Sequence, residues 1–496
     1  MSLVENRRLH YEENLLWEKE HSEHSGVDFP QLENIASRTG VDMRGDIGLP
    51  QLSEPQVVRH FVRMSTWNYS IDHGFFPLGS CTMKHNPRMN EKMARLNGFA
   101  NIHPLQLETT SQGALELMYE LQNWLGELTG LSGVCLAPSA GAHGELAGMM
   151  TIKHAHEKLG NAHKKIILAP DSSHGTNPAT AVMCGFEVRV IPTKDTGRLS
   201  VEAFKEALYR TDDKGADIAG MMVTNPNTCG LFESNILELS ELLHEAGGYF
   251  YCDGANFNAI VGKARPADFG VDVMHINLHK TFSTPHGGGG PGSGPICCTQ
   301  ELAQYMPVPV VVQNDDLSYS LESEDDRPAT LGRLKAFQGQ FGVYVRALSY
   351  MMSMGADGLK QVSEDAVLNA NYILSQLSND YHVPYDGYCM HECLLTDKKQ
   401  KEQGVATLDI AKALVEYGYH PMTVYFPLVL AGTMLIEPTE TESKDALDRF
   451  IVTMKNIAVD VKNGDCDKFH SFPQSSPRKR LDEVKAARNP VLRWTD

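Results

Sequence analysis

Two side chains in this sequence are suited to hold a ligand that carries an aldehyde and a cationic ring. Lys280 follows the apolar stretch 273–277 and offers an amine, which is a nucleophile toward aldehydes. Asp253 ends the hydrophobic stretch 249–252, where a half-buried carboxylate needs a cationic partner. Taken alone, Asp253 is equally well explained as the N-cap of a helix. Both residues lie where a strand is expected to end.

Two further stretches could hold the flat and the anionic parts of such a ligand. His174 follows the apolar stretch 165–169 and offers a ring that can stack on another ring. Ser139, Ala140 and Gly141 lie between an expected strand and an expected helix, where small residues let backbone N–H groups approach an anion. Taken alone, each of these stretches is also typical of an ordinary turn.

The four features together predict pyridoxal phosphate as the cofactor. This cofactor needs a lysine for its aldehyde, a carboxylate for its ring nitrogen, a stacking ring and an anion site. Their order along the chain (phosphate loop, stacking ring, Asp, Lys) fits that of fold-type I enzymes. We also expect His279 to help hold the phosphate, and Asn225 and Thr228 to contact the cofactor's ring oxygen or the substrate.

The elements that must position these residues alternate between strand and helix patterns. Strand patterns occur at 134–137, 165–169, 186–191, 220–224, 249–252 and 273–277, and helical patterns at 113–130, 201–209 and 235–246. This alternation predicts an α/β fold with a mostly parallel sheet covered on both faces. In such sheets ligands bind outside the carboxyl ends of the strands, where the four features lie.

We expect three parts along the chain. Residues 1–110 form an N-terminal segment that wraps the large domain and contributes to the active site, and residues 111–345 form the large cofactor-binding domain. A long helix at 333–355 leads into a smaller C-terminal α/β domain, residues 346–496, with a helix near 363–379 and a strand at 389–395. Its basic tail, 476–493, is either a solvated terminus or a docking arm for an acidic partner.

Composition narrows the class of protein. The chain has 496 residues, with 44 basic and 62 acidic side chains and a net charge of −18, which argues against nucleic acid as a partner. No apolar window is long enough for a membrane helix, and we see no signal peptide. The ten cysteines show no metal or disulfide spacing, so we expect a reducing, cytoplasmic location. The stretch 389–393 contains Cys, His and Glu, but a strand would point neighbouring residues to opposite faces, so no metal is expected.

Several longer stretches resemble one enzyme family. They are 68–72, 77–84, 99–104, 139–145, 224–228, 253–256 and 279–282 with the glycines that follow, and 437–440 continues the likeness. They are similar to the glycine decarboxylase P-protein of the glycine cleavage system, over about residues 65 to 450. Single-chain P-proteins are about twice as long, with two homologous halves. The chain therefore resembles subunit 2 of the split type, the half with the cofactor lysine.

The resemblance implies glycine decarboxylation, with transfer of the aminomethyl group to the lipoyl arm of H-protein. It also implies a separate subunit 1 and a heterotetramer of two of each chain. Lys280, Asp253 and His174 would be catalytic, and the 80–84 block and the glycines at 287–290 would form the pocket wall. Two alternatives remain at this point: a pyridoxal phosphate-dependent decarboxylase that releases a free amine, and an inactive scaffold subunit.

Overall fold

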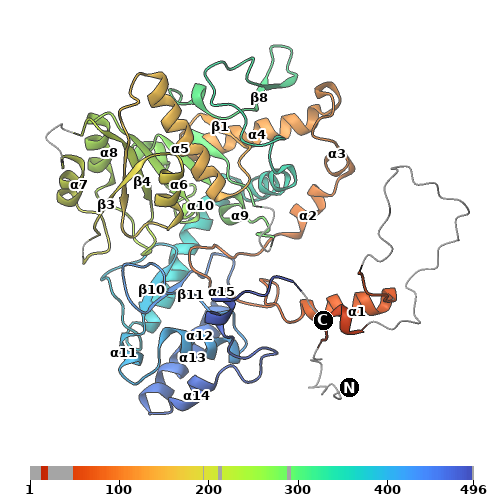
Figure 1. The fold of residues 1–496 in the computed structure, drawn as a ribbon, viewed down its shortest axis with the longest axis vertical. Helices are drawn as coiled ribbons and strands as arrows, with labels where there is room; N and C mark the ends of the chain where they lie inside the picture. The colour runs from red at the N-terminus through yellow and green to blue at the C-terminus, as the bar shows by residue number, and fades with distance from the viewer. Residues whose placement is uncertain (1–12, 20–47, 194, 211–214, 288–291, 494–496) are drawn as a thin grey trace, which may run out of the picture. The chain divides into compact units, whose positions relative to one another are not determined.

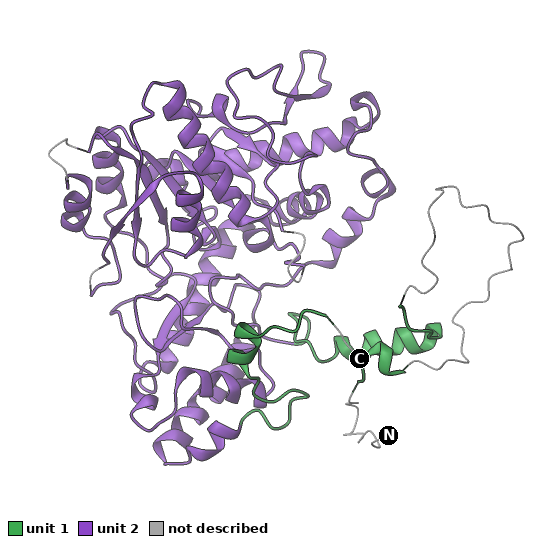
Figure 2. Cartoon of the chain, viewed as in Figure 1, with its two compact units in different colours: residues 1–73, 472–496 green, residues 74–471 purple. Residues whose placement is uncertain are grey.

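The computed structural model describes residues 13–19, 48–193, 195–210, 215–287 and 292–493. The chain divides into two compact units (Figure 2). The larger unit is residues 74–471 and holds all three sheets described below. The smaller unit combines residues 1–73 with 472–496.

The larger unit contains a seven-stranded sheet in the order β1-β7-β6-β5-β4-β2-β3. Neighbouring strands from β6 through β5, β4 and β2 to β3 pair in parallel, and β7 pairs antiparallel with both β6 and β1. The strands are β1 (Gly133–Cys135), β2 (Ile166–Pro170), β3 (Glu187–Ile191), β4 (Ile218–Thr224), β5 (Tyr249–Gly254), β6 (Val273–Ile276) and β7 (Ile296–Cys298). The predicted mostly parallel α/β sheet is thus confirmed, and β7 is a strand that the sequence patterns did not indicate.

Two hydrophobic cores lie on opposite faces of this sheet, because successive strand residues point to opposite sides. Leu168, Met221 and Phe250 join one core. Their respective neighbours Ile167, Met222 and Tyr251 join the other. The helices on the first side are α4 (Gln112–Thr129), α7 (Val201–Leu208) and α8 (Ile236–Glu245), and those on the second are α5 (Gly141–Lys158) and α6 (Thr176–Met183) (Figure 1).

A long helix, α10 (Phe341–Leu377), joins the large sheet to the rest of this unit. The expectation of a helix starting at residue 333 is wrong by eight residues, because 333–340 are not helical. The helix then runs on through the second expected helix near 363–379, with a break at Gly355, whose φ is 63°. Glycine takes this left-handed backbone conformation without steric cost, so the chain bends there while remaining helical on both sides.

The C-terminal part of the larger unit is built on a three-stranded antiparallel sheet. Its order is β10-β12-β11, formed by β10 (Cys393–Thr396), β12 (Thr433–Ile436) and β11 (Thr423–Val424). Helices α11 (Lys398–Lys401), α12 (Thr407–Glu416), α13 (Lys444–Lys462) and α14 (Asp467–Ser471) accompany it. The strand expected at 389–395 begins only at Cys393. The domain boundaries near 110 and 345 stay predictions.

The remaining elements of the larger unit are short. A hairpin of β8 (Val310–Gln313) and β9 (Tyr319–Glu322) packs on α4, and α2 (Arg88–Ala94) and α3 (Asn97–Ala100) pack on α10.

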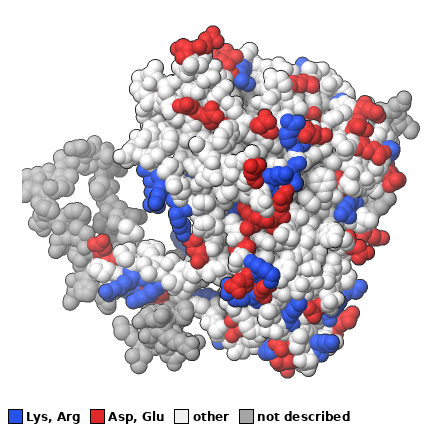
Figure 3. Space-filling view, turned by 180° about the vertical axis from the view of Figure 1, so that it is seen from behind, with Lys and Arg blue, Asp and Glu red and all other residues white. Residues whose placement is uncertain are grey.

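In the smaller unit, the described residues form helices α1 (Glu54–Ser65) and α15 (Glu483–Arg488) and a short 3-10 helix, Leu16–Lys19. Arg478 of the basic tail lies over the Trp67 ring, with 4.9 Å between the guanidinium carbon and the ring centroid. Among the described helices, none has the length and apolar character needed to cross a membrane. On the face shown in Figure 3, acidic and basic side chains are interspersed.

Candidate active site

A cavity of about 500 Å³ opens where β4, β5 and β6 end. Six of the residues predicted for the site line it: Lys280, Asp253, His174, Gly141, Thr228 and His279. These residues come from five separate connections of the large sheet, which places them at its carboxyl edge as the topology predicts.

Lys280 reaches the cavity from a short helix directly after β6. The strand ends at Ile276, and α9 (Leu278–Thr281) turns the chain so that the amine faces the cavity. Lys280 Nζ donates a hydrogen bond of 2.9 Å to the carbonyl oxygen of Ser80. The amine is therefore held at the cavity wall by a neutral acceptor.

Asp253 lies near the end of β5, and only 3% of the residue is exposed. Its Oδ1 accepts a hydrogen bond of 2.9 Å from the backbone N–H of Ala255 and lies 3.5 Å from His275 Nε2. Burial lowers the pKa of His275, so this imidazole is neutral near pH 7 and does not balance the carboxylate. A buried carboxylate that faces the cavity without a full countercharge fits a protonated ring nitrogen.

The N-terminus of α5 is suited to an anion. The helix begins at Gly141, and the N–H groups of a helix's first turn have no partner within the helix. The N-cap residue Ala140 provides no side-chain cap for them. Ser139 lies just outside the cavity lining, and its Oγ accepts a hydrogen bond of 2.8 Å from Lys335 Nζ. Lys335, which the sequence patterns did not single out, therefore places a cation beside this helix end.

His174 presents its ring at the cavity and is anchored at its other edge. The Nδ1 atom is 2.7 Å from Thr176 Oγ1, and the ring meets Phe426 edge-on, with 5.7 Å between centroids. Thr228 also lines the cavity, and its hydroxyl donates to the carbonyl oxygen of Ser172.

Two expected phosphate or cofactor contacts look different in the structure. Asn225 is not part of the cavity lining, and its Oδ1 accepts a hydrogen bond of 3.0 Å from the Glu233 backbone N–H. His279 does line the cavity, but burial, His286 and Lys280 lower its pKa to about 3. A neutral His279 imidazole cannot contribute positive charge to a phosphate, so any role there is as a hydrogen-bonding group.

The structure adds cavity residues that sequence reasoning did not assign. Glu145 lines the cavity one turn into α5, and burial together with the nearby Asp253 raises its pKa to about 8. The available signal was its place in the stretch 139–145, four residues after Gly141. From the expected pocket wall, Ser80 and Cys81 line the cavity. Of the expected glycine wall, residues 288–290 lie outside the described residues.

A cluster of potential metal ligands lies next to the cavity wall. His391, Glu392 and Glu437 are fully buried, and one ligand atom from each lies within 4.8 Å of the others. The strand pattern was expected to separate the polar side chains of 389–393. It does not do so here, because His391 and Glu392 precede the start of β10.

Comparison with known proteins identifies the fold class. A profile for class-V aminotransferases matches residues 144–308. The chain superposes with a TM-score of 0.70 on a crystal structure of glycine decarboxylase (P-protein) in inhibitor-bound form, at 19% identity, covering 85% of this chain and 93% of that one. A NifS-like protein aligns with a TM-score of 0.60 at 14% identity, covering 78% and 99% of the two chains. The fold and the cavity together define a fold-type I pyridoxal phosphate-dependent enzyme.

Closer relatives specify the family. A profile for the glycine dehydrogenase C-terminal domain matches residues 362–477. The probable glycine dehydrogenase (decarboxylating) subunit 2 of Caulobacter vibrioides is 54% identical, covering 99% of this chain and 94% of its own. The protein of the same name from Caldanaerobacter subterraneus is 52% identical, covering 91% of each chain. The chain belongs to the glycine dehydrogenase (decarboxylating) subunit 2 family.

Proposed function

We propose that this chain is the cofactor-carrying subunit of a glycine decarboxylase in the glycine cleavage system. It removes the carboxylate of glycine and passes the aminomethyl group to the lipoyl arm of H-protein. The carbon–carboxylate bond breaks to give carbon dioxide, a carbon–sulfur bond forms, and the lipoyl disulfide opens and takes up one proton. The observation that carries this proposal is that Lys280 and Asp253 line one cavity together with His174 and the start of α5.

The residues of this cavity fit pyridoxal phosphate. When bound, this cofactor supplies an electron sink for the electron pair that a departing carboxylate leaves behind. Lys280 would bind the aldehyde carbon through Nζ, and Asp253 would pair with the ring nitrogen. His174 would stack on the ring. The first turn of α5, with Ser139, Ala140 and Gly141 and the nearby Lys335 ammonium, would hold the phosphate.

The chain's own residues also handle protons and water. The Lys280 amine, when it is not bonded to the cofactor, can hold a proton between the Ser80 carbonyl and the cavity. Glu145 has a raised pKa, so its carboxyl is mostly protonated at pH 7 and adds little negative charge beside Asp253. Phe426 and Cys81 form less polar parts of the wall, which limit water around the reacting carbon.

We also propose the partners. The relatives are named as subunit 2, which supports a separate subunit 1 in the working enzyme. We propose a heterotetramer of two copies of each chain, with lipoylated H-protein delivering its arm to the Lys280 cavity.

The test is the Lys280→Ala variant, purified with its partner subunit. We expect it to lose the visible absorbance of bound cofactor and the exchange of labelled carbon dioxide into glycine. Lys263→Ala is the matched control, because that lysine pairs with Glu364 at the exposed surface, away from the cavity lining.

Asp253→Asn separates cofactor binding from catalysis. We expect it to keep the absorbance and to lose on the order of 100-fold in exchange rate, because a neutral amide no longer stabilises a protonated ring. Unchanged absorbance and exchange in Lys280→Ala would overturn the proposal. Exchange that needs no H-protein, or release of free methylamine as the main product, would favour a simple decarboxylase.

A further inference from the structure

The wall segment 80–84, which contributes Ser80 and Cys81 to the cavity lining, has an unusual backbone. Ser80 has φ of 63° and Thr82 has φ of 49°, although neither is a glycine. Residues with a side chain rarely adopt this left-handed region, and they remain there only when their surroundings fix them. Cys81, between the two, lines the cavity.

Two fully buried carboxylates fix the segment on either side of Cys81. Glu392 Oε2 accepts a hydrogen bond of 2.7 Å from the Ser80 backbone N–H. Glu437 Oε2 accepts one of 3.0 Å from the Thr82 backbone N–H, and its Oε1 accepts one of 2.6 Å from the Thr82 hydroxyl. These three hydrogen bonds hold the backbone on both sides of Cys81, and they offset the strain at Ser80 and Thr82.

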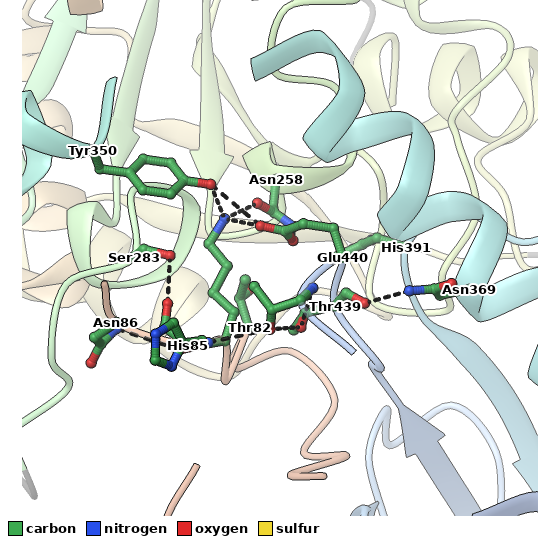
Figure 4. Close-up of polar contacts among 12 residues, drawn as sticks. Thr82, His85, Asn86, Asn258, Ser283, Tyr350, Asn369, His391, Thr439 and Glu440 are labelled. Carbon is green, nitrogen blue, oxygen red and sulfur yellow. Dashed lines mark hydrogen bonds and ion pairs between the residues drawn. The ribbon is translucent and has the colours of Figure 1, made fainter. Parts of the chain in front are cut away.

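A separate anchor holds the far end of the segment. Lys84 Nζ donates hydrogen bonds of 2.7 Å to Glu440 Oε1, 2.9 Å to Asn258 Oδ1 and 3.2 Å to Tyr350 Oη. Figure 4 shows Tyr350, Asn258 and Glu440 pointing toward one another from different elements. The segment is thus fixed at its end as well as at Ser80 and Thr82, which leaves the Cys81 turn as the part that faces the cavity.

The fixed turn acts directly on Lys280. The Ser80 carbonyl, one peptide unit from the N–H groups that the glutamates hold, accepts the hydrogen bond from Lys280 Nζ. We propose that Glu392 and Glu437 are positioning residues, which aim the Ser80 carbonyl at the Lys280 amine and keep the Cys81 thiol in the cavity wall. This inference rests on the proposed role of Lys280.

His391 is the third member of the buried cluster, and it does not take over the positioning role of the two glutamates. Its Nε2 lies 3.8 Å from Glu437 Oε1, and burial lowers its pKa, so it is neutral. Burial and the nearby Glu437 raise the pKa of Glu392 well above its usual range, so the two carboxyl groups avoid carrying two full charges side by side. Three of their four oxygens already accept hydrogen bonds from Ser80 and Thr82, so the cluster is directed at the turn.

The first test measures how readily Cys81 in this turn is alkylated, on the full-length chain without cofactor. Cys81 and Cys466 are the only half-buried cysteines among the described residues, the others being buried, so alkylation by iodoacetamide can be followed for each by peptide mass spectrometry. We expect Glu437→Ala and Glu392→Ala to raise the labelling rate of Cys81 about tenfold or more, with Cys466 unchanged. Trace acetylation of Lys280 should change in the same variants, while that of Lys263 should not.

Three further variants keep the test decisive. Asp397→Ala is the matched control, because this buried carboxylate accepts from the Thr407 backbone and does not contact the segment. Thr82→Val removes only one donor to Glu437, so we expect this variant to fold and to show a smaller rise in Cys81 labelling. Glu437→Gln keeps an acceptor and should restore part of the protection.

Three outcomes would overturn the inference. One is unchanged labelling of Cys81 and Lys280 in the glutamate variants, and another is an equal rise in Asp397→Ala. The third is a stoichiometric bound metal whose removal by a chelator frees Cys81 in the unmodified chain. These readouts need no turnover, so a failure of glycine decarboxylation would leave them interpretable.

Discussion

Glu145 is the residue whose behaviour at the cavity is least expected from the sequence. Its carboxyl accepts hydrogen bonds of 2.8 Å from the Thr176 hydroxyl and 3.4 Å from the Thr180 hydroxyl, and it is only 4% exposed. These donors would favour the ionised form, but burial and Asp253 outweigh them and raise the pKa to about 8. The Glu145 carboxyl is therefore largely protonated near pH 7.

Glu145 should make stability depend on pH. Its pKa is raised from 4.5 to about 8 in the folded chain, so between these values the folded state holds a proton that the unfolded state has released. The free energy of unfolding should fall as pH rises through this window. Glu145→Gln should remove that part of the dependence, as measured by urea unfolding at pH 5.5, 7 and 8.5. Parallel pH profiles for the two proteins would contradict the assigned ionisation.

The first turn of helix α5 depends on a glycine for its close packing beside the cavity. At the start of α5, a Cβ added to Gly141 would lie 2.4 Å from Asn277 Nδ2. That amide cannot easily move away, because its Oδ1 is 2.8 Å from His275 Nε2 and its Nδ2 is 3.3 Å from His279 Nε2. The end of β6 and the first turn of α5 are thus packed against each other through one glycine.

Gly141→Ala should weaken cofactor binding without unfolding the chain. The added methyl group displaces Asn277 and the helix start, and a shift of this size costs on the order of 10- to 100-fold in a positioned site. Gly175→Ala is the matched control, because a Cβ there has no atom within 4 Å. Cofactor titration by absorbance checks both, and equal affinities in the two variants would rule out the proposed anion site at α5.

For the whole molecule, apolar side chains near the cavity remain uncovered in the single chain. Phe426 lines the cavity, while Tyr425 is 46% and Leu428 is 82% exposed beside it. Exposed apolar groups at the edge of a functional site are typical of a surface that a partner covers. This agrees with the proposed second subunit.

Partner binding should therefore be required for activity and should protect this edge. We expect the chain alone to bind cofactor but to exchange carbon dioxide into glycine at least about 100-fold more slowly than the complex, because water is less well excluded. Hydrogen–deuterium exchange across 423–428 should slow when subunit 1 is added. Full exchange activity of the isolated chain would contradict this expectation.

The sequence alone determined the alternation of strands and helices, and it placed Lys280, Asp253, His174 and Gly141 at or just after the ends of strands. These features are local, because hydrophobic periodicity and turn residues act over a few positions. The same local patterns missed β7 and placed the start of α10 too early, since the extent of a buried element depends on what packs against it.

Only the tertiary structure decided which distant groups hold the cavity wall. Ser80 and Glu392 are 312 residues apart, and Thr82 and Glu437 are 355 apart, yet each pair shares a hydrogen bond. A hydrogen bond between segments so far apart has no local sequence signal, because it exists only once both sheets have formed and brought the partners together. The residue types that carry the chemistry of the site were therefore predictable from the sequence. The hydrogen bonds that hold the cavity wall in place were decided only by the folded structure.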